Sequence, residues 1–232
     1  MSEPVNFQTY PDRVTAANAA AELIAQSIRD SLSVQDNCAI VVSGGSTPGP
    51  SFERLSTMPL AWSRVTVVPS DERWVPVGHE DSNERLIRAS LLQNEARAGQ
   101  VLSLFRDGVA ADEACAVIDA DLADTATPFA CVLLGMGEDG HFASLFPDYD
   151  GLQQALNPNS ERRCMLIKTS GSPHLRISLS LSALMDTNHI VLLMFGEAKR
   201  RVFEAARLGD TTYPIEYLLR HHNSPLTVVW AP

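Results

Sequence analysis

The chain has 232 residues, 45% of them hydrophobic and 20% charged, which is typical of a soluble globular protein and predicts a single domain over residues 1–232. The 28 acidic residues outnumber the 18 basic residues and give a net charge of −10, which argues against a nucleic-acid-binding protein because it repels polyanions. The apolar runs are too short for a membrane helix, and "MSEPVNFQTYPDR" has no basic region followed by an apolar core. We therefore expect a cytoplasmic protein without membrane or secretory segments.

Helical and strand patterns alternate through the first half of the chain. Alanine, leucine and isoleucine at helical spacing predict a helix over 14–32, and "CAIVVSGG" predicts a buried strand that ends in glycines. A helix is expected in "STPGPSFERL", with Thr47 as its N-cap and Pro48 at its first position. "RVTVVPS" predicts the next strand, "DSNERLIRASLL" predicts a helix opened by a capping box of Asp81 and Glu84, and a further helix is expected over 110–123.

The second half continues the alternation and defines the fold class. Strands are predicted in "FACVLLG", "RCMLIKT", "LRISLSL", "HIVLLMF" and "PLTVVW", and a helix in "EAKRRVFEAARL". This order predicts a three-layer α/β fold with a mostly parallel sheet. Ligands bind such sheets beyond the carboxyl ends of the strands, so we expect the loops over 43–47, 70–76 and 135–141 to face one crevice.

The cysteine and histidine spacings do not predict a metal site. The histidines show neither His-x-x-x-His nor Cys/His ligand spacing, and the cysteines are widely separated, as expected for reduced core thiols. We therefore predict no metal. The residues concerned are His79, His141, His174, His189, His221 and His222, and Cys38, Cys115, Cys131 and Cys164.

The loop "SGGSTP" combines small residues and hydroxyl groups ahead of a predicted helix. Its backbone N–H groups could close on an anion, with hydroxyls at Ser43, Ser46 and Thr47 and close approach at Gly44 and Gly45. The Gly-Lys-Ser/Thr ending of a Walker loop is missing. The pattern predicts a phosphate site, and a tight turn with a helix cap is an equally good interpretation.

Three basic residues could contact an anionic ligand. In "SDERWVP", Arg73 offers a planar fork for phosphate or carboxylate, although the motif taken alone favours a surface salt bridge to Asp71 or Glu72. Arg176 shares one strand face with two serines, and that face could line a cleft or meet water. Lys199 in "GEAKR" could reach an anion from the first turn of a helix, or it could be solvated.

The stretch "LLGMGEDGHFASLFP" places His141 in a glycine-rich turn directly after a buried strand. Histidine changes its charge near neutral pH, so it can take a proton from water, and the nearby Asp139 could orient the ring. A lone histidine is more often a cap or a satisfied polar group. The position after the strand nevertheless favours a catalytic base.

Taken together and in this order, "SGGSTP", "SDERWVP", "DSNERL", "LLGMGEDGHFASLFP", "RISLSLSAL", "GEAKR" and "PLTVVWAP" resemble the 6-phosphogluconolactonase family. The central motif is highly specific, whereas the others are weak individually. The resemblance implies a modified Rossmann-like sheet of the glucosamine-6-phosphate deaminase and ribose-5-phosphate isomerase type. It also implies hydrolysis of 6-phospho-D-glucono-1,5-lactone to 6-phospho-D-gluconate in the oxidative pentose phosphate pathway, without metal or organic cofactor.

The same resemblance assigns roles to particular residues. It makes His141 the general base, with Asp71 and Asp139 as candidates to orient groups around it. A monomer that binds a small phosphorylated sugar lactone is expected. The positions assigned to substrate and phosphate are Ser43, Gly44, Gly45, Ser46, Thr47, Arg73, Asn83, Gly135, Gly137, Arg176 and Lys199.

Two departures from the family and two rival functions remain open. Gly49 and Pro50 replace a basic residue found in many members, and His174 stands where many have lysine. Either Arg176 and Lys199 suffice for the phosphate, or protonated His174 partly substitutes. The rivals are a sugar-phosphate deaminase or isomerase, which Arg73 and "ASLFP" disfavour, and a non-catalytic sugar-phosphate sensor.

Overall fold

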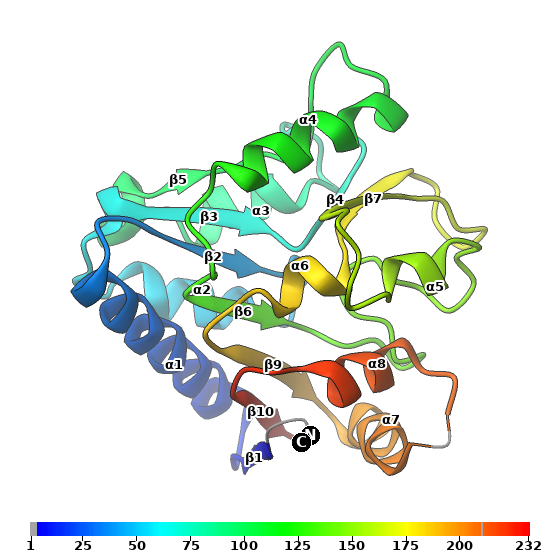
Figure 1. Cartoon of the computed structure of the whole chain (residues 1–232). Coiled ribbons are helices and arrows are strands. Elements are labelled where there is room, and N and C mark those ends of the chain that lie inside the picture. Colours follow the sequence, from blue (N-terminus) through cyan, green and yellow to red (C-terminus); the bar gives the residue numbers. More distant parts are fainter. Residues whose placement is uncertain (1–3, 210) are drawn as a thin grey trace.

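The computed structural model describes residues 4–209 and 211–232 and has a fully parallel central sheet (Figure 1). The strand order is β1-β10-β9-β6-β2-β3-β5. The predicted parallel α/β fold is thus confirmed, while the single-domain interpretation stays a prediction. The strands of this sheet are β1 (Val5–Thr9), β2 (Cys38–Val42), β3 (Val65–Pro69), β5 (Gln100–Val101), β6 (Cys131–Leu134), β9 (Ile190–Phe195) and β10 (Leu226–Ala231).

Helices cover both faces of this sheet because its strands are apolar on both sides. Along β2, Cys38, Ile40 and Val42 pack into one core and Ala39 and Val41 into the other. One face is covered by α1 (Arg13–Val34), α2 (Gly49–Ser56), α3 (Asn83–Ser90), η1 (Trp62–Arg64) and η2 (Asn94–Ala98), and the other mainly by α4 (Ala111–Ala123), α6 (Leu181–Met185), α7 (Glu197–Leu208) and α8 (Pro214–His221).

The winding of the chain reverses between two neighbouring strands, β2 and β6. From β2 the chain moves outward through α2 to β3 and β5, and it then returns to β6 on the other side of β2 before continuing to β9 and β10. The loops that leave the adjacent strands β2 and β6 therefore lead in opposite directions. This arrangement is the topological switch point at which doubly wound sheets bind their ligands.

A second, antiparallel sheet stands beyond the carboxyl ends of the central strands (Figure 1). It consists of β4 (Asp71–Arg73), β8 (Arg176–Leu179) and β7 (Cys164–Ile167), with Arg73 paired to Arg176. The "SDERWVP" segment, which we expected to be a loop, therefore contains a short strand. Its pairing with β8 places Arg73 and Arg176 together beside the switch point.

Several local predictions differ from the structure. Thr47 is not the N-cap of α2, because the helix begins at Gly49 with Pro48 as its cap residue. Ser82 rather than Asp81 caps α3, and its hydroxyl accepts the N–H of Arg85. The sequence reading also missed β1, β5, α8 and the short helices α5 (Leu152–Ala155) and α6. Of the N-terminal segment, residues 1–3 lie outside the described residues.

The four cysteines are free thiols, and Cys38, Cys131 and Cys164 are buried in strands as expected. Cys115 lies on α4, where its Sγ is 3.2 Å from that of Cys164. Among the helices of the described residues, none is sufficiently long and apolar to cross a membrane.

A partly buried histidine gives the fold a defined pH dependence. Burial lowers the pKa of His189 below its ordinary value of 6.5, and its ring contacts Ser27 and Thr227 at 3.2 and 3.0 Å. The unfolded chain therefore takes up the proton first as pH falls, so stability is lost as pH falls below about 6.5. We expect the free energy of unfolding to fall more steeply between pH 7.5 and 5.5 in the wild type than in His189→Gln.

Urea denaturation at several pH values measures this difference. The exposed His221 supplies the control, because His221→Gln should keep the pH dependence of the wild type. Equal pH dependence in the wild type and His189→Gln would contradict the assignment.

Candidate active site

An open pocket of about 240 Å³ lies at the switch point, against the carboxyl ends of β2 and β6 and the second sheet. The structure brings twelve of the fourteen predicted site residues to its wall; Ser46 and Asp139 are not part of the wall. The twelve are Ser43, Gly44, Gly45, Thr47, Asp71, Arg73, Asn83, Gly135, Gly137, His141, Arg176 and Lys199.

The centre of the site is a histidine–carboxylate pair. Nδ1 of His141 lies 2.5 Å from Oδ1 of Asp139, whose carboxylate also accepts the backbone N–H of His141 at 3.2 Å. The carboxylate fixes the ring orientation and favours the tautomer with its proton on Nδ1. Nε2 then carries the free lone pair that a general base needs.

Glycine is required where the loop passes this pair. A Cβ on Gly137 would collide with the ring of His141 and the carboxylate of Asp139. Gly140, which precedes the histidine, has a φ of +76°, a conformation that glycine adopts without steric cost. Ala143 has a φ of +48° in the same segment, and such backbone strain is typical of functional loops. The glycines of the motif thus allow the loop to hold the imidazole in this position.

The ring of Phe146 contacts both His141 and the guanidinium of Arg176. The rings of Phe146 and His141 have centroids 4.3 Å apart, and the guanidinium of Arg176 lies 5.2 Å from the Phe146 centroid. Phe146 therefore packs against both groups and limits their movement, with a cation–π contribution on the arginine side.

A buried carboxylate organises the floor of the pocket. Asp71 is only 6% exposed and accepts hydrogen bonds from the hydroxyls of Ser70 and Ser144 at 2.8 and 2.6 Å. Nη1 of Arg176 lies 3.9 Å from the same carboxylate. Asp71 thus orients Ser144 and Arg176, whereas the carboxylate partner of His141 is Asp139.

The neighbouring acid, Glu72, has a structural task. It is fully buried and accepts the backbone N–H groups of Arg73, Asn83 and Glu84 at 2.7–2.8 Å and the Ser82 hydroxyl at 3.0 Å. Burial raises the pKa of Glu72, and these hydrogen bonds oppose the rise. Glu72, on β4, thus accepts hydrogen bonds from the N–H groups at the start of α3. This contact between β4 and α3 replaces the predicted capping box.

Arg73 turns away from the two acids with which it could have formed a surface salt bridge. Its Nη1 donates to the backbone carbonyl of Asp81 at 2.6 Å, and its buried Nε has no partner in the described part of the chain. Arg73 forms no ion pair with either acid among the described residues, and it is part of the pocket wall. The geometry therefore favours ligand contact over the salt-bridge interpretation.

The first glycine loop is held in place by its neighbours. The hydroxyl of Ser43 donates to the carbonyl of Leu133 at 3.2 Å, contacts the Ser70 hydroxyl at 3.1 Å and accepts the N–H of Gly135 at 3.4 Å. Ser43 thus ties the ends of β2, β3 and β6 together. Its hydroxyl is engaged in the protein, so a ligand role falls to the backbone of this loop.

The same loop approaches the start of α3 closely. A Cβ on Gly44 would overlap the carboxamide of Asn83, whose Nδ2 donates to the carbonyl of Asp71 at 2.8 Å. Gly45 has a φ of +87°, which again favours glycine. Ser46 is exposed and lies outside the pocket wall, so the structure does not place its hydroxyl at the site.

Two cations of the pocket are partly desolvated. Burial lowers the pKa of Lys199, an effect that the carboxylate of Glu138 opposes, and burial likewise lowers the pKa of Arg176 against the opposing charge of Asp71. A cation that has lost part of its hydration is stabilised by an anionic ligand. With Arg73, these residues give the pocket three groups suited to a phosphate.

His174 is not one of the residues that form the pocket wall. Its Nε2 lies 3.0 Å from Oδ2 of Asp81, so its ring contacts a neighbouring carboxylate. The sequence reading also missed Ser144, a fully buried hydroxyl, and Met136 and Ala143, which line the pocket. The sequence gives one indication of Ser144, which is that a serine interrupts the apolar run "HFASLFP".

A carboxylate-oriented histidine in a pocket with three cations indicates the class: an enzyme that acts on an anionic small molecule. Comparison with known proteins agrees. The family described as glucosamine-6-phosphate isomerases/6-phosphogluconolactonase matches residues 11–230. The chain belongs to this family.

Individual relatives cover almost the whole chain. It is 37% identical to a 6-phosphogluconolactonase of Mesorhizobium japonicum, which spans 98% of this chain and 95% of the relative. The Pseudomonas aeruginosa 6-phosphogluconolactonase is 36% identical over the same shares. The crystal structure of a 6-phosphogluconolactonase from Shewanella baltica superposes with a TM-score of 0.93 at 33% identity, covering 100% of both chains. A monomeric glucosamine-6-phosphate deaminase shares the fold, with a TM-score of 0.80 at 16% identity and 97% coverage of both chains.

Proposed function

We propose that this protein hydrolyses 6-phospho-D-glucono-1,5-lactone to 6-phospho-D-gluconate, with His141 as the general base. The observation that carries the proposal is the pair of His141 and Asp139 in a pocket whose wall also holds Arg73, Arg176 and Lys199. The relatives named 6-phosphogluconolactonase support the choice of substrate. The protein would then act in the oxidative pentose phosphate pathway.

The reaction follows from the chemistry of a cyclic ester. Nε2 of His141 takes a proton from water, and the resulting hydroxide attacks C1 of the lactone. Asp139 stabilises the imidazolium that forms. Gly135 and Gly137 use their N–H groups for contacts to Ser43 and to the His141 carbonyl, so cationic side chains and the Gly44 loop are the better candidates to stabilise the oxyanion. When the C1–O5 bond breaks, the imidazolium returns its proton to O5.

The phosphate lies beside Arg73 in this proposal. Arg73 lines the pocket, and its planar guanidinium suits a phosphate oxygen. Arg176 and Lys199 supply further positive charge from β8 and from the first turn of α7. These groups bind a dianionic substrate locally, although the chain as a whole carries a net charge of −10.

Proton release from freshly generated phosphogluconolactone tests the proposal, after subtraction of spontaneous ring opening. We expect release that is proportional to enzyme concentration. Two outcomes would overturn it: ammonia release from glucosamine-6-phosphate without lactone hydrolysis would identify a deaminase, and tight binding of phosphogluconate without any turnover would identify a sensor.

Activity should survive chelation, because the proposed base, its orienting carboxylate and the phosphate ligands are all protein side chains. We expect an unchanged kcat after dialysis against EDTA, measured by the same proton-release assay. A loss of rate that one divalent ion restores would contradict this mechanism.

We further propose that the protein is a monomer and that it acts on its phosphorylated lactone in the cytoplasm. Sedimentation analysis of the purified chain tests the monomer, since a stable dimer would double the sedimenting mass.

A further inference from the structure

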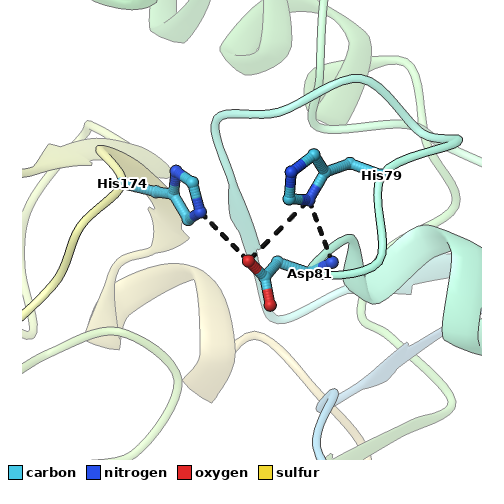
Figure 2. Close-up of side chains that lie close together, drawn as sticks. All are labelled: His79, Asp81 and His174. Carbon is cyan, nitrogen blue, oxygen red and sulfur yellow. Dashed lines mark hydrogen bonds and ion pairs between the residues drawn. The ribbon is translucent and has the colours of Figure 1, made fainter.

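Outside the pocket wall, three side chains with metal-ligand chemistry lie together: His79, Asp81 and His174 (Figure 2). His79 and Asp81 belong to the segment between β4 and α3, whereas His174 precedes β8. The sequence spacing could not reveal this group because His174 is 93 residues from Asp81. The antiparallel pairing of β4 with β8 brings the two segments side by side.

The distances within the group are close to those of a coordination sphere. Oδ2 of Asp81 lies 3.0 Å from Nε2 of His174 and 3.8 Å from Nδ1 of His79, and all three ligand atoms lie within 4.8 Å of one another. Two ligand atoms about 2.0–2.2 Å from a tetrahedral zinc ion are about 3.3–3.6 Å apart. To centre the three atoms on one ion, side-chain adjustments would have to shorten the two longer separations by up to about 1.5 Å and lengthen the shortest by about 0.5 Å.

The rings also present suitable nitrogens. Nδ1 of His79 accepts the backbone N–H of Asp81 at 3.1 Å, and Figure 2 shows the same nitrogen facing the Asp81 carboxylate. Nε2 of His174 faces the same carboxylate, and the two rings are nearly perpendicular, with centroids 5.5 Å apart. A metal ion would replace the proton between His174 and Asp81 and the long hydrogen bond to His79.

The backbone around the ligands is already fixed. The carbonyl of Asp81 accepts Nη1 of Arg73 at 2.6 Å, and the N–H of Trp74 donates to the carbonyl of Leu175, the neighbour of His174, at 2.8 Å. The side chains of the three ligands remain 28–47% exposed, so an ion can enter from solvent. Because the backbone is already held in place, only the ligand side chains need to become ordered when a metal ion binds.

We propose that His79, Asp81 and His174 form a binding site for a divalent transition-metal ion of the zinc class. Two imidazoles and one carboxylate are donors that suit Zn²⁺, Ni²⁺ or Cu²⁺ better than Mg²⁺ or Ca²⁺. Three protein ligands leave at least one position for water. Because the ion would lie outside the pocket wall and not among the catalytic groups, it is not required for hydrolysis, which agrees with the chelation prediction above.

Titration calorimetry with Zn²⁺ alone, on metal-free protein without substrate, tests the site independently of lactonase activity. We expect one ion per chain. Loss of even outer-shell partners typically weakens metal binding about 10–100-fold, so we expect His79→Ala, His174→Ala and Asp81→Asn each to weaken binding by at least that range. Zn²⁺ should also raise the melting temperature of the wild type, because it binds the folded chain. This increase should disappear in all three variants.

Two further variants serve as controls. The exposed His221, on α8, provides His221→Ala, which should bind Zn²⁺ like the wild type. His141→Asn removes the other close histidine–carboxylate pair and should also leave binding unchanged. The proposal is wrong if the wild type binds no Zn²⁺, if any of the three site variants binds as tightly as the wild type, or if His141→Asn abolishes binding. Circular dichroism spectra confirm that each variant is folded.

Discussion

Replacement of His141 by asparagine is expected to lower kcat for phosphogluconolactone by about 10²–10⁴-fold, the usual cost of losing a general base. Asparagine can still form a hydrogen bond with Asp139, but it cannot take a proton from water near neutral pH. The loop keeps its backbone contacts, among them the bond from the Gly137 N–H to the carbonyl of residue 141 at 2.9 Å. The fold and the affinity for phosphogluconate should therefore persist.

The pH profile separates a base from a structural histidine. In the wild type, kcat/KM should fall on the acid side, because a protonated imidazole cannot accept the proton of water. The residual rate of His141→Asn should lack this fall. His221→Asn is the matched control and should keep wild-type kinetics. A folded His141→Asn protein that retains wild-type turnover would show that the histidine is structural.

Much of the fold was predictable because its strands are continuous apolar runs with glycines at their ends. The run before "SGGSTP" and the run before "GMGEDGH" became β2 and β6, and their adjacency in the sheet explains why the two glycine loops meet at one pocket. The missed β1 pairs with β10 along its whole length, and the missed α8 buries Ile215 and Leu218 in the core.

The side-chain contacts within the site could be predicted only where residues of one motif interact with each other. His141 and Asp139 are two residues apart in a glycine turn, so the motif itself indicates their contact. The partners of Asp71 could not be predicted, since Ser144 reaches it across 73 residues. The contact of Glu72 with α3 likewise replaced a local capping box with a tertiary one. Long-range hydrogen bonds of this kind produce no recognisable pattern of residue spacing in the sequence.

The deletion of a single guanidinium should distinguish phosphate recognition from catalysis. Arg73→Ala is expected to raise KM for 6-phosphogluconolactone about tenfold to a hundredfold, since a charge-assisted hydrogen bond contributes about 1.5–3 kcal/mol. The change in KM for unphosphorylated gluconolactone should be much smaller, because that substrate has no phosphate to contact. The expectation follows from the position of Arg73 in the pocket wall and from the carbonyl of Asp81, which accepts a hydrogen bond from its Nη1 and fixes the guanidinium.

Steady-state kinetics on both lactones, each corrected for spontaneous opening, measure this contrast. Arg85, an exposed arginine on α3, supplies the control, and Arg85→Ala should change neither KM. Arg73→Lys should recover part of the loss, because lysine keeps the charge but lacks the planar fork. Equal losses on both substrates would instead assign Arg73 to the positioning of the segment around Asp81, since the carbonyl of Asp81 would then lose its donor whichever lactone is bound.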